Sequence, residues 1–119
     1  DMERRARGIR EIKEAAVKIS DRFHVKSTQN CLKDAKAELM NEAIVDTIED
    51  VCKKRGYTYM RMPSGPFHDT VSMAHICDVG MIFVPSIGGV SHSPYEDTAW
   101  EDVFAGAQVL ADTMGNLVG

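Results

Sequence analysis

The sequence has no apolar stretch long enough to cross a membrane. A membrane-spanning helix needs about 20 predominantly apolar residues, and the most apolar run here, at residues 79–85, is far shorter. The chain also opens without the basic and apolar segments that mark a secretory signal peptide. These absences argue against a membrane partner and favour a cytoplasmic protein.

Cysteine is scarce and is not arranged as a disulfide or metal framework. The three cysteines, Cys31, Cys52 and Cys77, are odd in number, and no two of them have C-x-x-C spacing. Such usage is typical of a reducing compartment, which again favours the cytoplasm. Cys52 falls within an apolar helical pattern, so we interpret it as a small core residue rather than a nucleophile.

A surplus of basic residues is missing as well. The 14 lysines and arginines are outnumbered by 18 aspartates and glutamates, which gives a net charge of −4. Four arginines lie among residues 4–10, but glutamates flank them closely, which is typical of a solvated helix face. The composition therefore argues against nucleic acid as a partner. A hydrophobic content of 44% is enough for a folded core.

Three long segments have the apolar period of an amphipathic helix. We expect these helices at residues 3–23, 37–55 and 98–115, with Gly56 as the C-cap of the second. The apolar stripe of the first helix consists of Ile9, Ile12, Ala16, Ile19 and Phe23. The stripe of the second consists of Met40, Ile44, Ile48, Val51 and Cys52, and that of the third of Trp100, Val103, Phe104, Ala107, Leu110 and Met114. The stripes of the second and third helices are predicted to face a core.

A polar stretch after the first helix separates two structural units. Residues 24–29 alternate weakly between polar and apolar side chains and are expected to form an edge strand. Residues 30–36 are polar and typical of a turn, so we place a boundary there. The chain is expected to be a fragment of a larger protein, because it offers too few strands for a complete sheet.

The centre of the chain alternates apolar segments with polar turns. Residues 57–62 and 79–85 are each typical of a β-strand, and the second is almost continuously apolar, as in a strand covered on both faces. Residues 69–76 between them can form two helical turns, which predicts a right-handed β-α-β unit. The turns after the two strands, residues 64–69 and 86–93, would then meet at the carboxyl edge of an open α/β sheet. Such sheets bind their ligands at that edge.

The second of these turns carries the best candidate for a metal ligand. His92 follows Gly88 and Gly89, whose lack of a Cβ lets the backbone turn sharply. Serines on both sides of His92 leave its imidazole unobstructed. A neutral imidazole on such a turn is a natural zinc ligand, although His92 could instead form a hydrogen bond within its own loop.

The first turn offers His68 and Asp69. Asp69 could cap the short helix, and His68 could contact a substrate or a metal-bound water. His75 would lie about 10 Å from His68, too far to share an ion, so we interpret it as structural. One zinc ion needs three or four protein ligands, and no H-E-x-x-H motif occurs. Further ligands are therefore expected outside this sequence.

Two other chemistries lack their motifs. Neither turn contains the phosphate-binding patterns G-x-x-x-x-G-K and G-x-G-x-x-G, which disfavours a phosphate cradle. Neither contains the pattern G-x-S-x-G, which disfavours an activated serine nucleophile.

Several consecutive blocks resemble the C-terminal part of the hydantoinase/carbamoylase amidohydrolases. The blocks are M-P-S-G-x-x-H-D at residues 62–69, G-M-I-F-V-P-S at 80–86, G-V-S-H-S-P at 89–94, and the segment from W-E-D at 100–102 to V-L at 109–110. This family of the two-metal aminopeptidase-like superfamily includes N-carbamoyl-L-amino-acid hydrolases, allantoate and ureidoglycolate amidohydrolases, and β-ureidopropionases. The resemblance implies an α/β fold, the C-terminal part of a doubly wound catalytic domain. It places a helix and strand of an α+β lid and dimerisation domain at residues 1–30, and the catalytic part at residues 31–119.

The resemblance also implies roles for residues of the two turns. His92 matches a histidine that ligates one of two divalent ions, zinc or manganese. The other ligands and the glutamate that serves as general base would precede this sequence, so no catalytic residue is expected within it. The residues expected to line the substrate pocket, the first four near the substrate's carboxylate, are Ser64, Gly65, His68, Asp69, Gly89 and Ser91. The family loop usually reads S-G-A-G-H-D, whereas Pro66 and Phe67 replace its central Ala-Gly here, which would narrow the pocket or reposition the loop.

The implied activity is metal-dependent hydrolysis of a C–N bond in N-carbamoyl amino acids or allantoate-like compounds. Two ions would activate a shared water and stabilise the developing oxyanion. The enzyme is expected to be a cytoplasmic homodimer that acts on small molecules, and this piece alone is expected to be inactive. The alternatives are a dipeptidase or deacylase of the same superfamily, or a non-catalytic module for small-ligand binding or dimerisation.

Overall fold

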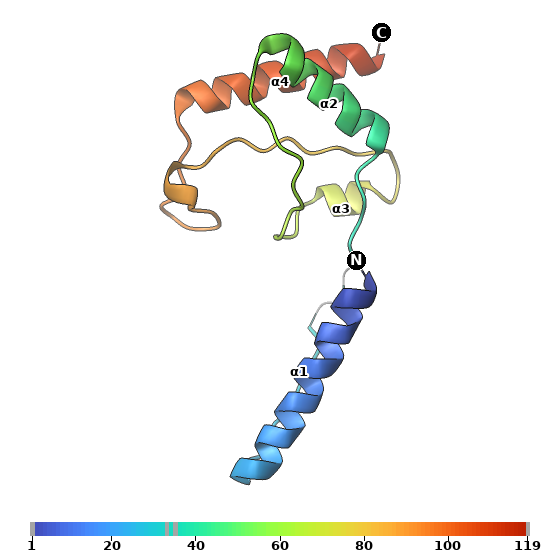
Figure 1. Cartoon of the computed structure of the whole chain (residues 1–119), viewed down its shortest axis with the longest axis vertical. Helices are drawn as coiled ribbons and strands as arrows, with labels where there is room; N and C mark the ends of the chain where they lie inside the picture. Colours follow the sequence, from blue (N-terminus) through green and yellow to red (C-terminus); the bar gives the residue numbers. More distant parts are fainter. Residues whose placement is uncertain (1, 33, 35, 119) are drawn as a thin grey trace. The chain divides into compact units, whose positions relative to one another are not determined.

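The computed structural model describes residues 2–32, 34 and 36–118, which belong to two compact units, Asp1–Glu38 and Leu39–Gly119. The elements follow the order α1 (Met2–Phe23), α2 (Glu42–Arg55), α3 (Thr70–Met73), the 3₁₀ turn η1 (Ile87–Gly89) and α4 (Trp100–Val118) (Figure 1). No strand occurs within the described residues, and no helix among them is long and apolar enough to span a membrane.

The first unit consists of α1 and a segment that returns along it. The helix ends where His24 adopts a left-handed conformation, with φ of 51°, and the N–H of Val25 donates to the carbonyl of Ser20. Side-chain contacts then hold the returning segment: Ser20 Oγ donates to Ser27 Oγ at 2.8 Å, and Arg5 pairs with Asp34 at 2.6 Å. The predicted helix is confirmed to within one residue.

One expectation for the first unit is wrong. Residues 24–29 do not form a strand, because polar side chains and not a backbone ladder attach this segment to α1. The apolar stripe of α1 is exposed, with Ile12 at 69% and Phe23 at 62%. The physical reason is that the returning segment, as far as it is described, offers mostly polar side chains to the helix.

The second unit has its core between α2 and α4. Val51, Cys52 and Val109 are buried, and Ile48, Tyr57 and Ile82 pack partly buried against them. Desolvation raises the pKa of the Cys52 thiol, in keeping with its interpretation as a core residue. Parts of the predicted stripes are exposed, however. Trp100 is 83% exposed, because the first turn of α4 extends beyond the side chains of the core.

The ends of α2 are set by its caps. Asn41 lies in an extended conformation and its side-chain oxygen accepts the N–H groups of Ala43 and Ile44, at 2.9 and 3.2 Å. The helix therefore begins five residues after the predicted start, since an N-cap residue cannot itself be helical. Gly56, with φ of 73°, donates its N–H to carbonyls of the last turn, which confirms the predicted C-cap.

Polar contacts bind the rest of the unit to α2. Arg55 pairs with Asp112 of α4 at 2.7 Å, which lowers the pKa of Asp112. Hydrogen bonds from Lys53, Arg61 and Tyr59 together lower the pKa of Glu49 to about 2. Because Tyr59 and Arg61 lie in residues 57–62, these contacts fasten that segment along the exposed side of α2.

Residues 57–62 and 79–85 do not form the predicted strands, because neither segment pairs in a β-ladder within the described residues. A strand requires a neighbouring backbone with which to form a ladder, and the described part of the chain places helices against these segments instead. Val79, for example, accepts a hydrogen bond from the N–H of Asn41 at the start of α2, at 2.9 Å. The predicted helix at residues 69–76 is shortened to α3 followed by turns, and Asp69 forms no side-chain capping bond among the described residues.

Candidate functional site

The structure brings the two polar turns together at their histidines. The ring centroids of His68 and His92 lie 6.2 Å apart, with the ring planes tilted by 46°. The two residues are separated in sequence by α3 and by the extended segment 79–85. Side chains from distant positions therefore converge at one place, which is a requirement for a binding site built from both turns.

The loop that carries His92 is closed by short hydrogen bonds. Ser86 Oγ donates to the carbonyl of Val90 at 2.7 Å, and the N–H of Ile87 donates to the carbonyl of Asp97 at 2.8 Å. Gly88 and Gly89 both have φ of 68°, a conformation that glycine adopts without steric cost. The tight turn predicted at these glycines is thus present.

His92 itself has a left-handed backbone, with φ of 53°. Its N–H donates to the Glu96 side chain, at 2.7 Å from Oε2, so the carboxylate stabilises the turn without contacting the imidazole. The side chain of His92 is exposed. An exposed imidazole on a braced turn can accept a metal ion or hydrogen-bond to a ligand.

His68 lies deeper than His92. Its ring edge contacts the ring of Phe83, with centroids 5.7 Å apart and planes at 65°. Its Nε2 atom is shielded from solvent and has no hydrogen-bond partner among the described residues. The preceding turn is fixed by Ser64, whose Oγ donates to the carbonyl of Pro66 at 3.0 Å, and Phe67 is partly exposed beside it.

The sequence analysis did not single out Phe83, although the alternation of side chains along residues 80–84 indicates the face on which it lies. Gly80, Ile82 and Val84 all line the apolar hollow between the helices of the second unit. Because side chains of an extended segment alternate between its two faces, Phe83 belongs to the opposite face, where it meets His68.

The other predicted pocket residues lie at the surface of the two turns. Ser64, Gly65, Asp69, Gly89 and Ser91 are all exposed. Among the residues predicted for the site, His68 and His92 have neighbouring rings, with centroids 6.2 Å apart. Within the described residues no group of three or more histidine, cysteine or acidic side chains is close enough to hold a metal ion. His92 fits part of a metal site, since it offers an exposed imidazole, and the shielded nitrogen of His68 beside it has no partner among the described residues.

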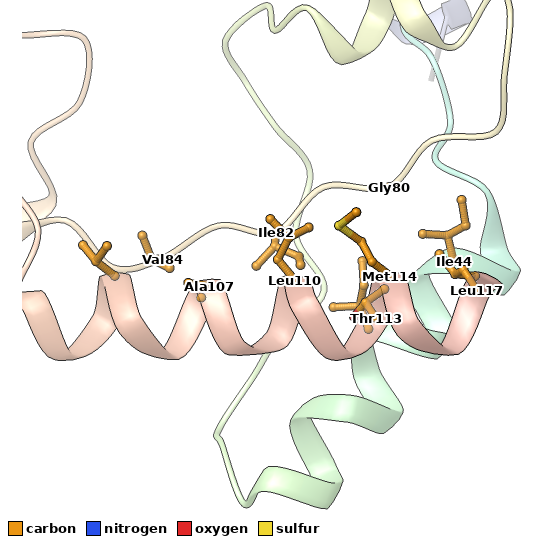
Figure 2. Close-up of a pocket in the computed structure, with 12 residues that line it drawn as sticks. Ile44, Gly80, Ile82, Val84, Ala107, Leu110, Thr113, Met114 and Leu117 are labelled. Carbon is orange, nitrogen blue, oxygen red and sulfur yellow. The ribbon is translucent and has the colours of Figure 1, made fainter. Parts of the chain in front are cut away.

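An apolar hollow of the second unit lies elsewhere. It has a volume of about 450 Å³ and is bounded by α2, α4 and the extended segment that contains Gly80. Figure 2 shows Ile82 and Val84 of this segment beside α4, with Ala107, Leu110 and Met114 on the helix. Thr113 is the polar member, and its Oγ1 has no partner in the described part of the chain. Because this hollow lacks histidines and charged groups, we regard it as a gap in apolar packing.

Comparison with known proteins identifies relatives of this chain. It is 41% identical over 99 residues to the N-carbamoyl-L-amino acid amidohydrolase of Geobacillus stearothermophilus, covering 83% of this chain and 24% of that protein. It is 32% identical over 118 residues to the ureidoglycolate hydrolase of Oryza sativa subsp. japonica, covering 98% and 24%. It is 39% identical over 72 residues to the allantoate amidohydrolase of Escherichia coli (strain K12), covering 60% and 18%.

These findings confirm the resemblance inferred from the sequence blocks. The chain spans no more than 24% of the length of these three relatives. Residues 11–116 match the family described as peptidase family M20/M25/M40, and this match supports the α/β class predicted for the fold. The chain belongs to peptidase family M20/M25/M40.

Proposed function

We propose that the protein is a metal-dependent amidohydrolase that cleaves a C–N bond in N-carbamoyl amino acids or in allantoate-like ureido compounds. The observation that carries the proposal is the exposed imidazole of His92 beside His68, in a chain whose relatives are named as amidohydrolases of such compounds. The present chain would supply one part of the active site, and the remaining ligands would come from outside it.

The proposed roles follow from the geometry of the two turns. Two divalent ions, zinc or manganese, would supply an activated water and stabilise negative charge on the substrate oxygen. His92 would hold one of them, and Glu96 would keep His92 in place through its backbone N–H. The exposed polar residues of the turns would line the substrate pocket: Ser64, Gly65, Asp69, Gly89 and Ser91.

We further propose that residues 1–30 belong to a lid and dimerisation domain and residues 31–119 to the catalytic domain. Support comes from the separate compactness of the first unit and from the exposed apolar stripe of α1, which includes Ile12, Ile19 and Phe23. Apolar stripes of this kind mark protein interfaces, so a homodimer formed through α1 is the expected assembly. The three cysteines are free thiols, in keeping with a cytoplasmic location.

The proposal is tested by replacing His92 in the intact protein. His92→Ala should lower both the metal content, measured by elemental mass spectrometry, and the turnover of N-carbamoyl amino acids. We expect a loss of at least about 100-fold in turnover, because even outer contacts to metal ligands contribute 10–100-fold. His75→Ala is the matched control, since His75 is exposed outside both turns. Full metal content with normal turnover in His92→Ala would refute the assignment.

A second candidate is hydrolysis of dipeptides or N-acyl amino acids, which the description of the matching family as peptidases favours. A substrate panel separates the two candidates. Faster turnover of dipeptides or N-acetyl amino acids than of N-carbamoyl amino acids and allantoate would replace the first proposal with the second.

A further inference from the structure

Residues 86–97 form the loop that carries His92, the His92 loop, and a backbone bond closes it. The N–H of Ile87 at its start donates to the carbonyl of Asp97 at its end, at 2.8 Å. Within the loop, the carbonyl of Ser86 accepts the N–H of Gly89 at 3.0 Å. The loop is therefore held by bonds of its own, which join its start to its end.

The hydroxyl of Ser86 adds a side-chain bond to this loop. Ser86 precedes η1, where a serine commonly accepts an N–H as an N-cap, but its side chain forms no such bond in the described part of the chain. Its Oγ instead donates to the carbonyl of Val90 at 2.7 Å, in a partly buried contact. This bond spans the two glycines of the turn and ends two residues before His92. Ser86 thus fixes the backbone that leads into the proposed metal ligand.

The backbone of His92 is held from both sides. Its φ of 53° costs a residue with a Cβ about 1–2 kcal/mol, and such conformations persist where the surrounding contacts determine them. On the C-terminal side, the carboxylate of Glu96 accepts the N–H of His92 at 2.7 Å, and the N–H of Glu96 donates to the carbonyl of Ser93 at 3.0 Å. On the N-terminal side, the bond from Ser86 to Val90 has the corresponding place.

We propose that Ser86 is a positioning residue, whose hydroxyl preorganises the His92 loop so that the imidazole is in place before a divalent ion binds. The inference rests on the proposed role of His92 as a ligand to one of two ions. A site that adopts its binding conformation only part of the time has an affinity reduced by that fraction. Removing the Ser86 bond should therefore weaken metal binding. Turnover at saturating metal should be preserved, because nearly every loop is then in the competent conformation.

The test measures metal affinity and turnover separately in the intact protein. The protein is stripped of metal, and its dissociation constants for zinc and manganese are measured by competition with a chromogenic chelator. Turnover of N-carbamoyl amino acids is then followed as the metal concentration is raised to saturation. Ser86→Ala removes the hydroxyl, and Ser86→Thr keeps it on a residue that suits the extended backbone there. Ser72→Ala is the control, because it removes an exposed serine hydroxyl outside the His92 loop.

We expect Ser86→Ala to weaken metal binding by about 5–10-fold, the value of one hydrogen bond. Its turnover at saturating metal should stay within about 2-fold of the original. Amide hydrogen exchange at residues 87–92 should be faster in metal-free Ser86→Ala than in the metal-free original protein, and adding metal should remove the difference. Ser86→Thr should bind metal to within about 3-fold of the original, and Ser72→Ala should not differ from it.

Unchanged metal affinity in Ser86→Ala would refute the inference, and so would a loss of affinity that Ser86→Thr does not restore. Turnover that stays low at saturating metal would also refute it, because Ser86 would then act beyond the positioning of His92. The His92→Ala variant separates this inference from the proposed function. If His92→Ala binds metal as tightly as the original protein, the proposed role of His92 is refuted. If His92→Ala binds metal weakly and Ser86→Ala binds it normally, the role of Ser86 alone is refuted.

Discussion

Two glycines of α4 should respond oppositely to the same substitution. A Cβ built on Gly106 would collide with Cγ1 of Val84 in the extended segment, whereas Gly115 has no atom within 4 Å of such a Cβ in the described part of the chain. Valine prefers one χ1 rotamer because it is β-branched, so moving Val84 away from the new Cβ requires a less favourable rotamer or a shift of the segment. Gly106 is therefore required for the close approach of residues 79–85 to α4, and Gly115 is not.

The size of the effect follows from two opposing contributions. Replacing glycine by alanine inside a helix stabilises it by about 0.8–1 kcal/mol, and both variants gain up to this amount. Overpacking a filled contact costs about 1–3 kcal/mol, and only Gly106→Ala incurs this cost. The free energy of unfolding should therefore differ between Gly106→Ala and Gly115→Ala by about 1–3 kcal/mol, with Gly115→Ala the more stable.

The assay is urea denaturation followed by circular dichroism, with the free energy of unfolding obtained from the midpoint and slope. The double variant Val84→Ala/Gly106→Ala should be more stable than the sum of the single effects predicts, because removing the valine methyl groups makes room for the new Cβ. Equal stabilisation by Gly106→Ala and Gly115→Ala, with additive effects in the double variant, would show that Val84 does not approach α4 as described.

Three further predictions concern the rest of the second unit. Asn41→Ala should lower the free energy of unfolding by about 1 kcal/mol and Asn41→Asp should restore it; equal urea midpoints for all three proteins would contradict the cap. The pKa of Glu49 is lowered from its usual 4.5 to about 2, so its contacts stabilise the protein above pH 4.5, and this contribution is lost as the pH falls toward 2. An NMR titration of the Glu49 carboxyl group with a midpoint near 4.5 would exclude its hydrogen bonds with Lys53, Arg61 and Tyr59. Cys52 should react with a thiol reagent far more slowly than the exposed Cys77, because it is buried and its pKa is raised; equal rates in the folded protein would place Cys52 at the surface.

The helices were predictable because their signals are local. The period of apolar residues and the C-cap Gly56 identified α1 and α4 to within three residues at each end, and α2 to within five. The start of α2 was predicted too early, because the N-cap Asn41 sets it and a contact distant in sequence adds to that cap. The N–H of Asn41 donates to the carbonyl of Val79, which draws Asn41 into an extended conformation. No pattern within residues 37–41 shows that bond.

The apolar segments at residues 57–62 and 79–85 were correctly identified as extended, but a strand also requires a partner. Period and composition indicate how a segment is shaped, whereas pairing depends on backbone from other parts of the fold. The same limit applies to the apolar stripe of α1. An amphipathic pattern shows which face of a helix is apolar but not what covers it, and Ile12 and Phe23 on this stripe are exposed.

The candidate site was predictable as far as its residue types allow. Glycines, serines and a histidine in residues 86–93 indicated an exposed imidazole on a tight turn, which the structure contains. The approach of His68 to His92 depended on the spatial order of two turns, and the contact between His68 and Phe83 depended on which face of an extended segment each side chain takes. The approach of His68 to His92 could be inferred only through the β-α-β hypothesis. The face on which Phe83 lies could be inferred from the alternation of side chains along an extended segment.

On the proposed role of His92 as a metal ligand, its left-handed backbone, with φ of 53°, sets stability and turnover against each other at one residue. A residue with a Cβ is disfavoured there by about 1–2 kcal/mol relative to glycine, although glycine loses part of this gain to the entropy of the unfolded chain. In directed evolution, a library selected for thermal resistance alone should therefore accumulate glycine at this position, whereas a library selected for growth on a ureido nitrogen source should retain histidine. The residue found at position 92 would then distinguish variants selected for thermal resistance from variants selected for turnover.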